Sequence, residues 1–112
     1  MITWVIPQLA IAEVSDLDGI TLDTDTLLVD ARLYFNKKGD PIKGIDSELA
    51  IVENILQYNR RVIVFCDGGM DRSPFIVAKV LCVLFDDYEM GDAYRFIKEK
   101  RPHIVEHYEW GE

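Results

Sequence analysis

The sequence predicts one α/β domain, residues 1–112, with a central, mostly parallel sheet of about four to five strands flanked by helices. Stretches that suit strands alternate with stretches that suit helices, which is typical of parallel sheets. A chain of 112 residues is long enough for one hydrophobic core and leaves no room for a second. Its 49% apolar and 29% charged residues exclude a wholly disordered or fibrous protein.

Each element in the first third follows from a local pattern. Residues 2–12 carry short apolar groups on either side of Pro7, which favours one strand or two short strands broken by the proline. Residues 13–25 are rich in acids and indicate an exposed connection with, at most, a helical turn. Residues 27–29 are continuously apolar, which is typical of a buried parallel strand.

The middle of the chain predicts a loop, a helix and a strand. Residues 36–41 contain asparagine, glycine and proline and therefore favour turns. A helix follows from a cap at Asp46 or Ser47. Its expected buried face has apolar residues at helical spacing: Leu49, Val52, Ile55 and Leu56. Residues 62–65 form an apolar run, which predicts a central strand covered on both faces.

Two further helices complete the predicted fold. Residues 75–85 are apolar except for Lys79, so this helix should be buried nearly all round. Pro74 falls in its first turn, where proline is tolerated. A last helix covers about residues 91–100 and is ended by Pro102.

The charge balance limits the partners we expect. Twenty Asp and Glu against twelve Lys and Arg give a net charge of −8, which repels nucleic acids and anionic membranes. No apolar run approaches the roughly 18 residues of a membrane span, and two cysteines are too few for a disulfide scaffold. Residues 103–107 match a zinc-protease string without a downstream ligand, so we expect no metal. These features predict a cytoplasmic monomer.

The segment between the apolar strand and the apolar helix contains a thiol, two glycines and an arginine. Its backbone N–H groups can curl around a tetrahedral dianion at the positive end of the helix. The predicted phosphate-binding residues are Asp67, Gly68, Gly69, Met70, Asp71 and Arg72. The same donors favour the thiolate of Cys66, the candidate nucleophile. Arg72 can bind two phosphate oxygens through its planar guanidinium. Ser73 can form a hydrogen bond with the sulfur of Cys66 and thereby ease the departure of this sulfur at the end of a reaction.

The pattern Cys-x-x-Gly-x-x-Arg-Ser resembles the signature of cysteine-dependent protein phosphatases, in particular the small dual-specificity and archaeal tyrosine phosphatases. Residues 6–11 resemble their opening strand, residues 72–74 the start of their central helix, and residues 93–102 their closing Arg-Pro helix. The resemblance implies a phosphotyrosine-phosphatase-like fold. It also implies hydrolysis of phosphotyrosine through a phosphocysteine intermediate without a cofactor, and leaves phosphoserine and phosphothreonine open as further substrates.

The resemblance further implies a carboxylic acid that protonates the leaving oxygen and later deprotonates a water. Asp40 is the first candidate, because it lies in a Gly-Asp-Pro turn ahead of the helix that begins near Asp46. Asp30, at the end of a strand, is the second candidate. Asp71 is the third, since it directly precedes Arg72.

Some features depart from the family and keep alternatives open. Phe65 stands where a histidine usually precedes the nucleophile, and Asp67 and Asp71 would weaken phosphate binding unless their side chains point outward. A catalytically weak, phosphate-binding pseudophosphatase is therefore one alternative. A rhodanese-like sulfurtransferase is another, because residues 28–32 resemble the strand opening of that fold. Cys82, in the apolar helix, is expected to serve packing.

Overall fold

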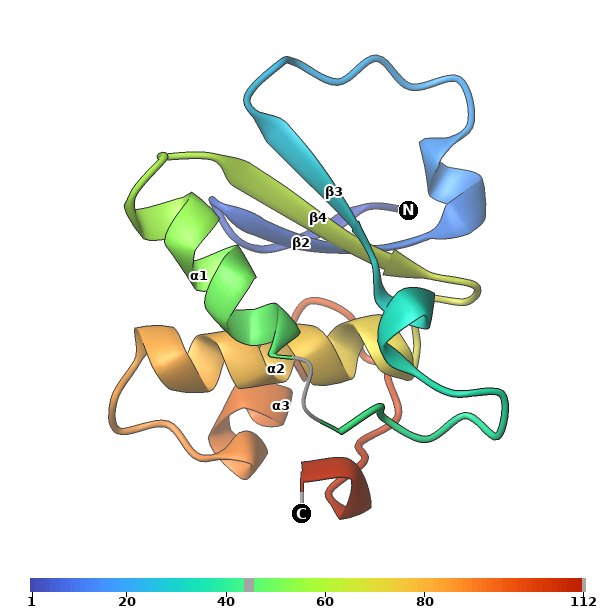
Figure 1. The fold of residues 1–112 in the computed structure, drawn as a ribbon, viewed down its shortest axis with the longest axis vertical. Coiled ribbons are helices and arrows are strands. Elements are labelled where there is room, and N and C mark those ends of the chain that lie inside the picture. Colours follow the sequence, from blue (N-terminus) through green and yellow to red (C-terminus); the bar gives the residue numbers. More distant parts are fainter. Residues whose placement is uncertain (44–45, 112) are drawn as a thin grey trace.

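The computed structural model of the chain describes residues 1–43 and 46–111. Within them, a four-stranded sheet carries α-helices on one face (Figure 1). The strands are β1 (Thr3–Ile6), β2 (Leu9–Glu13), β3 (Thr26–Asp30) and β4 (Arg61–Cys66), and the helices are α1 (Ser47–Leu56), α2 (Arg72–Leu84) and α3 (Met90–Lys98). This arrangement confirms the predicted fold class. No helix in this part of the chain combines the length and apolar character needed to cross a membrane.

The strands lie in the order β1-β2-β4-β3. Strand β1 runs antiparallel to β2, whereas β2 and β3 both run parallel to β4. Pro7 falls in the turn between β1 and β2, so residues 2–12 form two short strands. The carboxyl ends of parallel strands meet at one edge of the sheet, where α/β proteins place their ligands. Cys66, the last residue of β4, lies at that edge opposite Glu13 of β2.

Strand β4 is covered on both faces, as predicted. Val62 and Val64 face the main core, which α1, α2 and α3 complete, with α3 packed against α2. Ile63 faces a smaller cluster on the other side of the sheet, together with Ala10 and Ala12 of β2. Leu17 and other residues of the segment after β2 pack against this smaller cluster.

Strand β3 is less buried than its apolar sequence predicts. It is the last strand of the sheet, and Leu28 is 41% exposed. Leu27 and Val29 pack against the main core, while Leu28 lies on the opposite face, outside the smaller cluster. The prediction of a fully buried strand was therefore wrong, because the smaller cluster does not extend as far as this edge.

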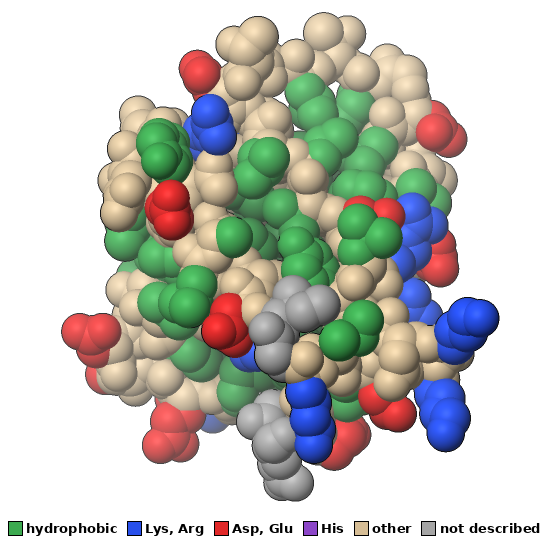
Figure 2. All heavy atoms as spheres, viewed as in Figure 1, with side chains coloured by type: hydrophobic (Ala, Val, Ile, Leu, Met, Phe, Trp, Pro, Cys, Tyr) green, Lys and Arg blue, Asp and Glu red, His purple; other side chains and the backbone are tan. Residues whose placement is uncertain are grey.

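Helix α1 begins at Ser47 with Asp46 before it, as predicted, but only part of its predicted buried face is buried. Ile55 is buried and Val52 packs against the core, as expected. Leu49 and Leu56 are 55% and 68% exposed, whereas Ile51 and Ile55 are buried. Two apolar stripes with helical spacing exist in this sequence, and periodicity alone does not choose between them. On the face shown in Figure 2, apolar side chains accordingly reach the surface around β3 and α1.

Helix α2 is buried along most of its length. Pro74 lies in its first turn, and the residues from Ser73 to Leu81 are buried except for Lys79. The end of the predicted segment is more open, since Val83 and Phe85 lie at the surface. This burial fixes the start of α2 beneath the carboxyl end of β4.

Candidate active site

Cys66 lies at the end of β4 with 4% of its surface exposed. Its Sγ is 3.2 Å from the hydroxyl of Ser73, and the backbone N–H of Ser73 donates to the same sulfur at 3.5 Å. Ser73 is fully buried in the first turn of α2. The sulfur therefore lies beside a hydroxyl and a backbone N–H at the start of a helix.

A hollow of about 150 Å³ opens above the thiol. It is lined by the residues of the loop between β4 and α2, together with both of its ends: Cys66, Asp67, Gly68, Met70, Asp71 and Arg72. The structure thus gathers Cys66 and Arg72 around one space with room for a small anion. Gly69, in the same loop, is buried and has a φ of +63°, in the left-handed region that favours glycine.

The two loop acids reach partners outside the loop. Asp67 has a 70% exposed side chain, and its carboxylate accepts from Arg32 at 2.8 Å. Asp71 has a 52% exposed side chain and lies 3.3 Å from Nε2 of His107. These contacts direct both carboxylates outward, which is the condition under which the loop can still hold an anion.

Phe65 points to the other face of the sheet and packs on the smaller cluster. The guanidinium of Arg32 lies 5.7 Å from the centre of its ring. Position 65 therefore contributes packing and gives Cys66 no polar support.

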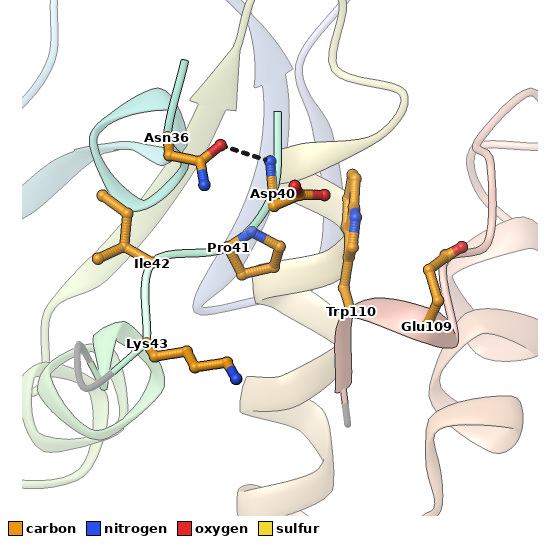
Figure 3. Close-up of a pocket in the computed structure, with 7 residues that line it drawn as sticks. All are labelled: Asn36, Asp40, Pro41, Ile42, Lys43, Glu109 and Trp110. Atoms are coloured by element: carbon orange, nitrogen blue, oxygen red, sulfur yellow. Dashed lines mark hydrogen bonds between the residues drawn. The ribbon is translucent and has the colours of Figure 1, made fainter. Parts of the chain in front are cut away.

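Asp40 lies beside a second, larger hollow. This space of about 590 Å³ is lined by the loop that carries Asp40 and by the C-terminal residues Glu109 and Trp110 (Figure 3). The backbone N–H of Asp40 donates to Oδ1 of Asn36 at 3.0 Å, and its exposed carboxylate is directed toward the Trp110 ring. Cys66 does not line this hollow.

The aromatic rings of Phe35 and Trp110 link residues that line the two hollows. Trp110 packs against Phe35, with ring centres 5.0 Å apart. The guanidinium of Arg72 lies 5.9 Å from the centre of the Phe35 ring. Asp40 thus lies beside Trp110 and Arg72 beside Phe35, the two rings that pack against each other.

Asp30 is held by an arginine. Its carboxylate accepts from Nε and Nη2 of Arg32, both at 2.9 Å, and from the backbone N–H of the same residue. The hydrogen bonds from the Arg32 side chain lower the pKa of Asp30 from its ordinary value, against the opposing effect of burial. An acid whose charged form is favoured in this way is a poor proton donor at neutral pH.

Cys82 lies in the second half of α2, where its Sγ is 3.9 Å from the sulfur of Met90. Burial raises the pKa of this thiol, with smaller contributions from Asp92 and Glu89. Both features suit a packing residue. Over residues 1–43 and 46–111, no three His, Cys, Asp or Glu side chains lie close enough together to hold a metal ion.

Sequence reasoning missed the residues that support the loop from a distance. Arg32, Arg101 and His107 each contact one loop residue, across 32 to 36 positions of sequence. Of these three residues, Arg101 has a signal in the sequence, the Arg-Pro pair at 101–102. This pair indicates a resemblance to the closing helix of the phosphatases but does not predict a contact with the loop.

The sequence model of one family, described as "Dual specificity phosphatase, catalytic domain", matches residues 12–111. The chain belongs to this family. Membership indicates a protein phosphatase and confirms the predicted resemblance, which favours a phosphatase over a sulfurtransferase. No curated protein sequence matches the chain significantly.

Solved structures of phosphatase domains share the fold. Tk-PTP, whose structure was solved in the active form, is 18% identical in sequence, with a TM-score of 0.67. This match covers 98% of the present chain and 90% of the Tk-PTP chain. A leucine-rich-repeat and phosphatase-domain protein from Entamoeba histolytica is 15% identical, with a TM-score of 0.70. This match covers 97% of the present chain and 84% of the Entamoeba chain. The human tyrosine phosphatase-like serine/threonine/tyrosine-interacting protein is 17% identical, with a TM-score of 0.61. This match covers 97% of the present chain and 89% of the human chain.

Proposed function

We propose that this phosphatase domain hydrolyses phosphotyrosine in proteins through a phosphocysteine intermediate, and accepts phosphoserine and phosphothreonine as further substrates. The observation that carries the proposal is the placement of the Cys66 thiol. It forms part of an anion-sized hollow that Arg72 also lines, and it lies 3.2 Å from the Ser73 hydroxyl. The match to the dual specificity phosphatase family supports phosphoserine and phosphothreonine as further substrates.

In the first step, the thiolate of Cys66 attacks phosphorus. An S–P bond forms, and the P–O bond to the substrate side chain breaks. The loop N–H groups and the Arg72 guanidinium bind the three remaining phosphoryl oxygens. Asp40, in its protonated form, gives a proton to the leaving oxygen, so the substrate departs as a neutral hydroxyl group.

In the second step, a water molecule attacks the phosphocysteine. The Asp40 carboxylate accepts a proton from this water as the new O–P bond forms. The S–P bond breaks, inorganic phosphate is released, and the thiolate of Cys66 is regenerated. The Ser73 hydroxyl donates to the departing sulfur and stabilises its charge.

Asp40 is our choice of general acid because its two competitors are engaged. Asp30 is bound by Arg32 in its ionised form. Asp71 faces His107 at the surface. Asp40 instead lies exposed on a turn that contains Gly39, beside the larger hollow that Trp110 also lines.

Turnover of p-nitrophenyl phosphate in the presence of a chelator tests the nucleophile. We expect activity in the native chain and in Cys82→Ser, and loss of activity in Cys66→Ser. Activity that requires a metal, or that survives Cys66→Ser, would contradict the proposal. Vanadate binding without any release of phosphate from p-nitrophenyl phosphate would support the phosphate-binding pseudophosphatase instead.

The pH dependence of three variants tests the acid. Asp40→Asn should lower kcat by about 100-fold on phosphotyrosine and abolish the fall in rate at high pH. The loss should be smaller on p-nitrophenyl phosphate, whose leaving group needs less protonation. Asp30→Asn and Asp71→Asn serve as matched controls. If either of them removes the basic limb, that residue is the acid.

The family match supports a phosphorylated protein as partner, and the net charge of −8 disfavours a nucleic acid or an anionic membrane surface. A single domain acting as a cytoplasmic monomer, without cofactor, is part of the same proposal. Analytical ultracentrifugation should give one species near the chain mass of 12.9 kDa.

A further inference from the structure

Three consecutive residues of the loop between β4 and α2 each contact the segment that follows α3. The pairs are Gly69 with Arg101, Met70 with Val105, and Asp71 with His107. In the first two pairs, the loop contributes its backbone carbonyl, at 2.9 Å and 2.8 Å. The segment after α3 is thus a partner of the loop backbone at successive positions.

These two carbonyl contacts determine the direction of the next two N–H groups. In a trans peptide, the C=O and the following N–H point in opposite directions. All peptide bonds in the described chain are trans. When Arg101 holds the Gly69 carbonyl outside the hollow, the Met70 N–H is therefore turned toward the opposite side. The contact between Val105 and the Met70 carbonyl does the same for the Asp71 N–H.

Glycine at position 69 is required by the same contact. A Cβ atom there would lie 2.5 Å from Nη2 of Arg101 and 3.1 Å from the backbone of Ala12 in β2. Arg101 therefore fits over the loop only because this residue has no side chain. The left-handed φ of Gly69 gives a second reason for glycine.

Arg101 is fixed from its other side as well. Its Nη1 donates to the hydroxyl of Thr3 in β1 and to the carbonyl of Met1, both at 2.8 Å. The guanidinium thus joins the start of β1 to the loop and cannot rotate away without losing these bonds. Such a group holds a carbonyl more rigidly than a freely moving lysine would.

We infer that Arg101 is a positioning residue for the reaction proposed above: by holding the Gly69 carbonyl, it aims the Met70 N–H at the phosphoryl group. This inference rests on the proposed function. It predicts that Arg101 acts on anion binding through the loop backbone, without contact between Arg101 and the substrate.

Vanadate affinity and p-nitrophenyl phosphate kinetics test this inference. Arg101→Gln should weaken vanadate binding about tenfold, the scale of one hydrogen bond from a charged donor, and lower kcat/KM similarly. Arg101→Lys should recover part of both, because it retains charge and a donor. The matched control is Arg95→Gln on α3, whose side chain is 75% exposed and pairs with its helix neighbour Asp92. It should behave as the native chain.

Ile51→Ala separates positioning from stability. This change removes a buried core side chain of α1 and leaves the bonds of Arg101 to Gly69, Thr3 and Met1 in place. It should lower the melting temperature but leave vanadate affinity unchanged. If Ile51→Ala weakens vanadate binding as much as Arg101→Gln, the effect is general destabilisation and the inference is wrong.

The amide resonance of Met70 provides a direct readout. In the native chain it should shift on addition of vanadate, and in Arg101→Lys the shift should be smaller. This comparison holds even if Arg101→Gln does not fold. A native chain that binds no vanadate would overturn the proposed function as well. A native chain that binds it, with all Arg101 variants equal to Arg95→Gln, would overturn the positioning role alone.

Discussion

Arg32 joins two of the acids at the site. It binds the carboxylate of Asp30 through two nitrogens and that of Asp67 through a third. Its guanidinium also lies against the ring of Phe65. One side chain therefore draws an acid out of the anion hollow and keeps another acid ionised. The two acids in turn raise the pKa of the Arg32 guanidinium, so its charge is permanent.

Arg32→Gln should change the stability of the protein in acid. Because the folded pKa of Asp30 lies below its ordinary value of 3.8, the pair stabilises the fold above that pH. The contribution disappears as the pH falls through the folded pKa. We expect Arg32→Gln to be less stable than the native chain near pH 6, with the difference vanishing in strong acid. Urea unfolding across pH measures this.

The matched control for Arg32 is Arg60→Gln, because Arg60 donates to the neutral side chain of Asn54. Its effect on stability should be the same at every acid pH. Parallel profiles for both variants would show that Asp30 is not held ionised by Arg32.

Ser73→Ala should slow the second chemical step more than the first. Its hydroxyl is the buried partner of the Cys66 sulfur, so its loss leaves the departing thiolate with one donor fewer. We expect steady-state turnover to fall about tenfold while a burst of leaving group appears in rapid mixing. Ser47→Ala, which changes another buried serine, should show neither effect. If Ser73→Ala turns over slowly and shows no burst of leaving group, Ser73 acts in the first step instead.

At the scale of the elements, two substitutions in α1 test which of its two apolar stripes supports the core. Ile51→Ala should destabilise the fold by about 2–5 kcal/mol, because it leaves a cavity beside α2 and β4. Leu49→Ala should change stability by about 0.5 kcal/mol or less, since this side chain is already 55% exposed. Chemical denaturation of both variants gives the comparison. Equal losses would mean that the helix is rotated relative to the structure.

Helix α3 is attached to the C-terminal segment through a buried phenol. The Tyr94 hydroxyl accepts from the backbone N–H of His107 at 3.1 Å, and burial raises the pKa of Tyr94 to about 12. In the unfolded chain this group ionises near its ordinary value of 10. Its contribution to stability is therefore complete below pH 10 and is lost as the pH rises toward 12.

Tyr94→Phe should remove this alkaline loss and also cost about 1 kcal/mol at neutral pH, because one buried N–H loses its acceptor. Stability measured between pH 7 and pH 11 tests both parts. Tyr58→Phe, at an exposed tyrosine, is the control and should leave the profile as in the native chain.

The sequence predicts best what is continuous along the chain. The strand that ends at Cys66, the loop and the start of α2 follow one another, so their order and apolar character are enough to identify them. The faces of β3 and α1 depend on how far the neighbouring layers extend, which no local pattern records. Arg101 meets Gly69 across 32 residues, and only the folded backbone brings them together.

At the scale of the whole molecule, charge should govern the encounter with substrates. The net charge of −8 is spread over a small body with a radius of gyration of 13.0 Å. Attraction over such distances raises association rates for positively charged partners. Phosphorylated segments with basic flanking residues are therefore favoured over acidic ones.

Two phosphotyrosine peptides that differ only in lysine or glutamate flanks test this expectation. At low salt, kcat/KM should be about tenfold higher for the lysine peptide. The two values should converge near 1 M salt, where screening shortens the range of charge interactions to about 3 Å. A preference that persists at high salt would point to a specific contact rather than to the net charge.

The dependence of the loop on residues 101–107 also bears on when the enzyme matures. A chain emerging from the ribosome exposes β4, the loop and α2 before the partners of Gly69 and Met70 have been synthesised. Nascent chains would carry the reactive thiol without its finished oxyanion cradle. Catalytic competence would then require that residues 101–107 have also been synthesised and have folded against the loop.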